Sequence, residues 1–105
     1  MPLTRRNAAP NAVNGISCKI VTGTSGATEG STTTVAHGLL LADIVSWVSN
    51  LKLSATSIIT QGHTATNGFK YQVFPDTNNM VIQLDGISSE NALSKAVEIL
   101  IWFRL

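Results

Sequence analysis

From residue 16 onward, the sequence alternates apolar and polar residues in short runs that are separated by turn signals. A period of two is typical of β-strands, and no stretch of eleven residues shows the three-to-four spacing of an amphipathic helix. The pattern predicts strands over 16–22, 31–37, 44–53, 56–60, 69–74, 80–84 and 96–105. Residues 87–94 leave room for one helical turn, because Ser88–Leu93 is cap-like. We therefore expect an all-β fold, an antiparallel β-sandwich of jelly-roll type, over residues 16–105.

Residues 1–15 do not share this periodicity. Pro2, Pro10 and several Asn residues break up any regular pattern, and Arg5 and Arg6 stand here without an acidic neighbour. One interpretation is a frayed chain end. The other is an extended N-terminal arm that lies on a neighbouring subunit or another protein, with Arg5 and Arg6 in the attachment. No apolar segment follows the arginines, so we expect no cleaved secretion signal and a protein made in the cytoplasm.

Composition excludes several classes of partner. Charged residues make up 12% of the chain and the formal net charge is +1, while 10 Ser, 12 Thr and 8 Asn supply much of the polarity. Such a chain has no strong field to attract nucleic acid or anionic lipid. No apolar run approaches the roughly 20 residues of a membrane helix. We expect neither a nucleic-acid nor a membrane partner, and the single Cys18 excludes an intrachain disulfide.

The last predicted strand is apolar on both of its faces. Val97, Ile99, Ile101, Phe103 and Leu105 share one face, while Leu100 and Trp102 lie on the other. A strand with one face in water is polar on that face, so both faces are expected to be covered. The cover is either the opposing sheet with its loops or another subunit, and the small size of the domain favours another subunit. We therefore predict a homo-oligomer, most simply a trimer, with an interface at Val97, Ile99, Ile101, Trp102 and Phe103.

No motif in the sequence nominates catalytic chemistry. His37 and His63 are 26 residues apart and lack metal-ligand spacing, and no nucleophile signature joins a serine to them. We expect no enzyme activity, no metal and no cofactor. His37 ends a β-branched run before Gly38 and Leu39. This position predicts a structural role for the histidine, in which a ring nitrogen forms a hydrogen bond with nearby backbone. Sugar binding stays open, because Trp47, Tyr71 and Trp102 could stack on a sugar, although polar loops are also the ordinary state of a β-sandwich.

Four segments in order carry a resemblance to a known group of proteins: Thr33–Leu39, Ile44–Val48, Phe74–Ile82 and Val97–Ile101. Together they resemble small β-sandwich modules in the virion appendages of tailed bacteriophages, over about residues 31–103. The stretch 54–68 departs from that pattern. The resemblance implies a symmetric assembly on a virion and no catalytic residues. It leads us to expect a non-enzymatic virion structural protein, a capsid decoration or small head or tail appendage rather than a whole tail fibre. Its partners would be itself and other virion proteins. The alternative is a module that binds host-surface glycans for attachment.

Overall fold

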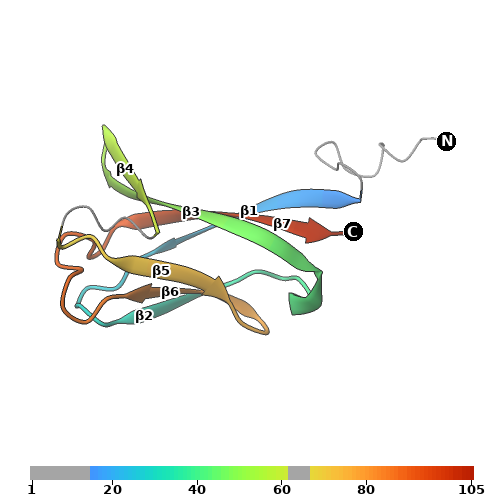
Figure 1. Ribbon diagram of the computed structural model, residues 1–105, viewed down its shortest axis with the longest axis horizontal. Helices are drawn as coiled ribbons and strands as arrows, with labels where there is room; N and C mark the ends of the chain where they lie inside the picture. The colour runs from blue at the N-terminus through green and yellow to red at the C-terminus, as the bar shows by residue number, and fades with distance from the viewer. Residues whose placement is uncertain (1–14, 62–66) are drawn as a thin grey trace.

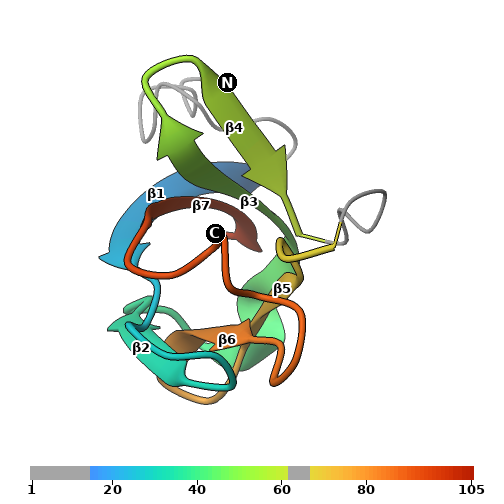
Figure 2. The same cartoon turned by 90° about the vertical axis from the view of Figure 1, so that its left-hand side faces the viewer.

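The computed structural model describes residues 15–61 and 67–105, which form two antiparallel β-sheets packed face to face (Figure 1). The expected β-sandwich is therefore confirmed. The expected N-terminal arm, with Arg5 and Arg6, lies outside the described residues except for Gly15. Figure 2 looks along the sandwich and shows one sheet above the other.

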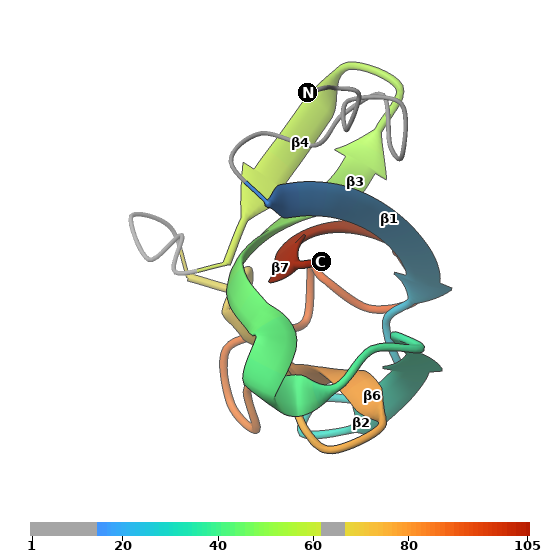
Figure 3. The same ribbon diagram turned by 90° about the vertical axis from the view of Figure 1, so that its right-hand side faces the viewer.

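Within residues 15–61 and 67–105, seven strands form the two layers. Their bounds are β1 (Ile16–Thr24), β2 (Thr32–Ala36), β3 (Ile44–Ser54), β4 (Ser57–Thr60), β5 (Tyr71–Pro75), β6 (Asn79–Leu84) and β7 (Ala96–Arg104). All seven runs predicted from alternation are strands, with ends that differ from the prediction by at most two residues. A short 3-10 helix, Leu41–Asp43, precedes β3. Figure 3 shows the segment around this helix crossing from one sheet to the other at that end of the sandwich.

The strand order places the first and the last strand of the described residues next to each other. One sheet has the order β1-β7-β3-β4 and the other has the order β2-β6-β5, with every neighbouring pair antiparallel. The four-stranded sheet is held around β7, which pairs with β1 on one side and with β3 on the other. The hairpin of β3 and β4 projects above the sandwich at one end (Figure 1).

The core lies between the two sheets and follows the alternation of the strands. In β7 the residues Val97, Ile99 and Ile101 are buried, and Leu51 contributes from β3. The three-stranded sheet supplies the opposing wall, with Tyr71, Val73, Met80, Ile82 and Leu84. Burying a side chain of this size contributes about 1.5–3 kcal/mol. Because no disulfide is possible in a chain with one cysteine, this burial carries most of the stability.

The helical turn that the sequence allowed within 87–94 is absent; this segment is a series of turns. The reason is local hydrogen bonding. The Asp85 carboxylate accepts hydrogen bonds from the backbone N–H groups of Ile87 (2.9 Å) and Ser88 (2.7 Å), which fixes a turn around the side chain. The N–H of Ser89 then donates to Glu29 on a different loop (3.0 Å), while the Ala92 N–H donates to the Ser89 carbonyl (2.9 Å), which closes a single turn and not a helix.

Candidate interaction surface

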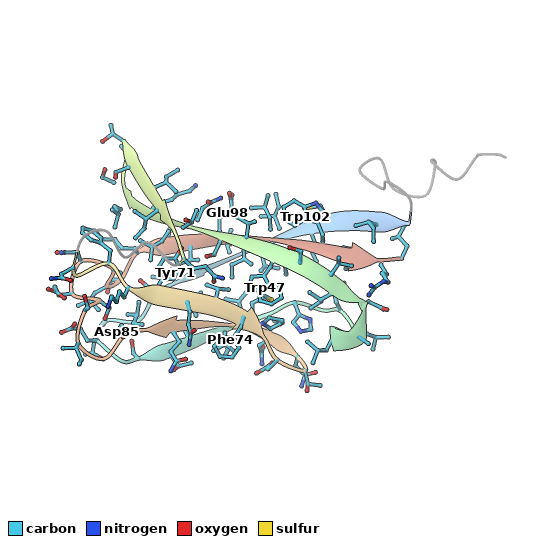
Figure 4. The ribbon with its side chains drawn as sticks, in the orientation of Figure 1. Trp47, Tyr71, Phe74, Asp85, Glu98 and Trp102 are labelled. Carbon is cyan, nitrogen blue, oxygen red and sulfur yellow. The ribbon has the colours of Figure 1, made fainter. Side chains whose placement is uncertain are left out.

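The terminal strand β7 does not present its fully apolar face to another subunit. Val97, Ile99 and Ile101 point into the sandwich and are closed off by the opposing sheet within one chain. Their assignment to an interface between subunits is therefore corrected: the covering layer is the β2-β6-β5 sheet. Phe103 lies on the same face nearer the end of the strand and is half-buried. Trp102 is the one interface candidate that lies on the outer face of β7 (Figure 4).

The outer face of the four-stranded sheet carries an apolar patch around Leu100. The register places Ile20 of β1 and Val48 of β3 on either side of Leu100, and Trp102 occupies the next outward position along β7. Ile20 is 57% exposed and Val48 is 41% exposed, while Leu100 and Trp102 are half-buried. We call Ile20, Val48, Leu100 and Trp102 the outer patch. No other strand or loop of the described chain covers it.

Polar residues border the outer patch on one side. The next outward row of the same sheet consists of Thr22, Glu98 and Asn50 on β1, β7 and β3. Figure 4 shows Glu98 and Trp102 on the same outer side of the sheet. An apolar centre with an aromatic side chain and a polar border is the composition of a protein–protein interface. This composition suits the face to binding another protein surface.

Tyr71 is buried and is therefore not a platform on which a sugar could stack. Its side chain is buried between the sheets, where the hydroxyl donates to the Ile59 carbonyl at 3.2 Å and accepts from Ser49 Oγ at 3.1 Å. Burial raises the pKa of the Tyr71 hydroxyl, and the hydrogen bond from Ser49 opposes that rise. Tyr71 therefore ties β5 to β3 and β4 across the core.

Trp47 is also engaged within the chain. It lies on the inner face of β3 and packs against the core, and its indole N–H donates to the Val73 carbonyl at 2.8 Å (Figure 4). Of the three aromatic residues proposed for sugar stacking, Trp102 alone lies on an outward face. The glycan-binding hypothesis thus loses the cluster of aromatic residues on which the sequence argument depended.

His37 has the structural geometry that the sequence predicted. The residue is fully buried, and its Nδ1 accepts a hydrogen bond from the Leu39 N–H at 3.0 Å. Because Nδ1 is the acceptor, the ring is neutral with its proton on Nε2, which donates to the Asp76 carbonyl at 2.9 Å. The backbone carbonyl of His37 accepts from Lys19 Nζ at 2.6 Å. His37 thus joins the corner after β2 to the β5–β6 turn.

Gly38 is required for that corner. Its φ of +68° lies in the left-handed region, and a Cβ there would stand 2.9 Å from Lys19 Nζ. The corner directs Leu39 back toward the core, where it packs at the edge of the apolar cluster. The sequence signal for this arrangement was the triplet of His37, Gly38 and Leu39 at the end of a β-branched run.

The described residues contain no cluster of three or more His, Cys, Asp or Glu side chains that could hold a metal ion. His63 lies outside the described residues. The Asp85 carboxylate accepts the N–H groups of Ile87 and then Ser88, and these hydrogen bonds lower its pKa. Its role is to fix a turn. Over residues 15–61 and 67–105, no helix is long and apolar enough to span a membrane.

The sequence reasoning missed two contacts that lock one side of the sandwich. Gln61 follows β4, and its Oε1 accepts the backbone N–H of Val73 at 2.6 Å. The indole N–H of Trp47 donates to the backbone carbonyl of Val73. No pattern in the sequence connects residues 47, 61 and 73, so only the three-dimensional structure brings them together.

Comparison with known proteins gives no relative from which a function could be transferred: no family model, curated protein or solved structure matches this chain.

Proposed function

We propose that this protein is a non-enzymatic structural component of a phage particle that acts as a symmetric homo-oligomer, either a capsid decoration or a small head or tail appendage. The observation that carries the self-association is the outer patch. Four apolar side chains from three adjacent strands share one exposed face, and a polar row borders them. The phage setting rests on the resemblance of the four sequence segments to virion modules.

The outer patch has the chemistry for packing against a second copy. Ile20 and Val48 are each about half exposed, so covering them contributes about 1 kcal/mol apiece. Trp102 supplies a large, rigid side chain of the type that dominates interface energies. The only charged side chain in the bordering row is Glu98, so close approach of two such faces removes little charge from water.

The jelly-roll type of the sandwich is part of this proposal. The first two strands of the chain pair with the last two, β1 with β7 in one sheet and β2 with β6 in the other. That is the order produced when a long hairpin wraps around a barrel-like core. It supports the jelly-roll assignment and, with it, the resemblance to virion modules.

The test compares two isoleucines of equal exposure on the same sheet face. Ile20 is 57% exposed and belongs to the outer patch, whereas Ile58 is 58% exposed and lies on the projecting β3–β4 hairpin. We expect light scattering to give an oligomer for the wild type and for Ile58→Glu, and a smaller mass for Ile20→Glu. A wild-type monomer at micromolar concentration overturns the self-association, and so does an unchanged mass for Ile20→Glu.

The particle setting needs its own measurement. We expect the wild type to bind phage particles that lack it, and free sugars should not compete with that binding. Binding of the isolated protein to glycans, together with loss of particle binding when sugar is added, would replace the structural proposal with host attachment through glycans.

A further inference from the structure

On one side of the β-sandwich, side chains bind backbone groups of both edge strands, β5 and β4. On that side the Val73 N–H of edge strand β5 is bound by Gln61 and its carbonyl by Trp47. Pro75, two residues farther along the same edge, has no N–H to offer. The adjacent edge strand β4 has its Ile59 carbonyl bound by the Tyr71 hydroxyl. An additional strand at β5 therefore finds both backbone groups of its central residue, Val73, already bonded and no N–H at Pro75.

Strand β2, on the opposite side, has a free edge. It is the terminal strand of its sheet in the described chain, with β6 as its only neighbour. Two hydrogen bonds at its ends fix which residues face β6: Leu84 N–H donates to the Ser31 carbonyl, and His37 N–H donates to the Asn78 carbonyl. Because the direction alternates along an antiparallel strand, Thr33 and Val35 also face β6. The N–H and C=O groups of Thr32, Thr34 and Ala36 consequently point away from the sheet.

We propose that this edge pairs with the same edge of a second copy, so that β2 of the two copies runs antiparallel about a two-fold axis at Thr34. In this register Thr34 faces Thr34, and Thr32 faces Ala36. Each of these pairs exchanges two hydrogen bonds, so every outward N–H and C=O group of Thr32, Thr34 and Ala36 finds a partner. The two three-stranded sheets then form one continuous six-stranded sheet.

The side chains of β2 permit this approach. Thr32, Thr34 and Ala36 are exposed, small and uncharged, so the two copies meet without repulsion. Threonines that face each other across antiparallel strands form favourable pairs. Edge strands that must stay unpaired carry charges, prolines or bulges, and β2 has none of these. The strand is also short, because positive φ values at Gly30 and Gly38 frame it, so its length matches that of a second β2.

Charges near the two ends of the strand are complementary in the same register. The ammonium of Lys19 is held at the His37 carbonyl, beyond one end of β2. Glu29 lies beyond the other end, where it accepts the Ser89 N–H. Antiparallel pairing brings the end with Lys19 to the end with Glu29 of the second copy, and the two-fold axis repeats this twice. This complementarity favours a second copy of this chain over an unrelated extended peptide.

This inference deepens the proposed function, because it names a contact through which copies associate, on the sheet opposite to the outer patch. A two-fold contact gives an assembly with an even number of chains. If the outer patch alone holds the oligomer together, the number of chains can be odd or even.

Amide hydrogen exchange of the wild-type protein tests the pairing directly. In the assembled protein we expect the amides of Thr32, Thr34 and Ala36 to be protected alongside those of Thr33 and Val35, which bond to β6. We expect Thr34→Lys to place two ammonium groups at the two-fold axis and separate the copies. Exchange at Thr32 and Ala36 should then accelerate by about tenfold or more, while Thr33 and Val35 stay protected.

Gln72→Lys is the matched control, because Gln72 is exposed on the same outer sheet face but belongs to the closed edge strand β5. Light scattering should show half the wild-type mass for Thr34→Lys and an unchanged mass for Gln72→Lys. Unprotected amides at Thr32, Thr34 and Ala36 in the assembled wild type overturn the β2 pairing while leaving the proposed function intact. An unchanged mass for Thr34→Lys also overturns it, whereas a wild-type monomer overturns both.

Discussion

Replacing His37 tests whether a fully buried imidazole holds the corner between β2 and the β5–β6 turn. The ring makes two hydrogen bonds of opposite sense, accepting from the Leu39 N–H and donating to the Asp76 carbonyl. Removing one partner of a buried hydrogen bond costs about 1–3 kcal/mol, because the remaining group is left without a partner. Ala at residue 37 loses both bonds and the packing of the ring. We expect His37→Ala to lower the free energy of unfolding by about 4 kcal/mol.

Two further variants at the same position separate the two ring nitrogens. The amide of Gln reaches the position of Nε2 and can donate to the Asp76 carbonyl, but it leaves the Leu39 N–H without an acceptor. The shorter Asn places its oxygen near Nδ1 and keeps that acceptor, while losing the bond to Asp76. We expect each variant to cost about 1–2 kcal/mol, and therefore clearly less than Ala.

Urea denaturation at neutral pH measures these differences in the free energy of unfolding. The comparison requires that the slope of this free energy against urea concentration is the same for all variants. Ile87→Ala serves as the control, since Ile87 is 88% exposed and its truncation should change stability by no more than about 0.5 kcal/mol. A cost below about 1 kcal/mol for His37→Ala refutes the two-bond assignment. Equal costs for Ala, Gln and Asn would show that packing of the ring matters and its hydrogen bonds do not. Chelators should leave wild-type stability unchanged.

Three more perturbations follow from the structure. Tyr71→Phe removes the hydroxyl that links the sheets and should lower the free energy of unfolding by about 1.5 kcal/mol. An unchanged midpoint of urea denaturation would refute this role. Gly23→Ala would place a Cβ 2.5 Å from Val35 Cγ2 and should cost about 1–3 kcal/mol, whereas Gly86→Ala meets nothing within 4 Å and should be close to neutral. The pKa of Asp85 is lowered from its ordinary value of 3.8, so its contribution is present above that pH and is lost as the pH falls through the lowered value. Asp85→Asn should therefore show a weaker loss of stability with acid than the wild type, and identical acid profiles would exclude this role.

Alternation predicted the strands well because each strand of a sandwich has one buried face, and burial of that face imposes a period of two. The same rule identified Val97, Ile99 and Ile101 as one apolar set but could not say what covers them. Periodicity indicates that one face of a strand is buried. It does not indicate whether the residues that cover this face belong to the same chain. The three-stranded sheet supplies that cover, and its strand β2 begins at Thr32, 69 residues before Ile101 in sequence.

Local motifs predicted the structure correctly where the bonding partners lie close in sequence, and failed where they lie far away. The role of His37 was predictable, because one of its partners is two residues away and the glycine beside it marks the corner. The helical turn near Ser88 was wrongly allowed, since a cap-like sequence cannot reveal that Asp85 and Glu29 take the N–H groups of this segment. Trp47 and Val73 are 26 residues apart in sequence, so the sequence around either residue does not predict their contact.

The distribution of polar cross-links explains why self-association should use one side of the sandwich. Trp47, Gln61 and Tyr71 bind the backbone groups of β5 and β4, so these edges are stabilised and blocked by the same side chains. On the opposite side of the molecule, Lys19 of β1 binds the carbonyl of His37 just beyond β2. The backbone groups of Thr32, Thr34 and Ala36 therefore stay available. Edge strands that stay unpaired commonly carry a charge, a proline or a bulge. Strand β2 carries none of these, which is the physical reason to look for a second copy there.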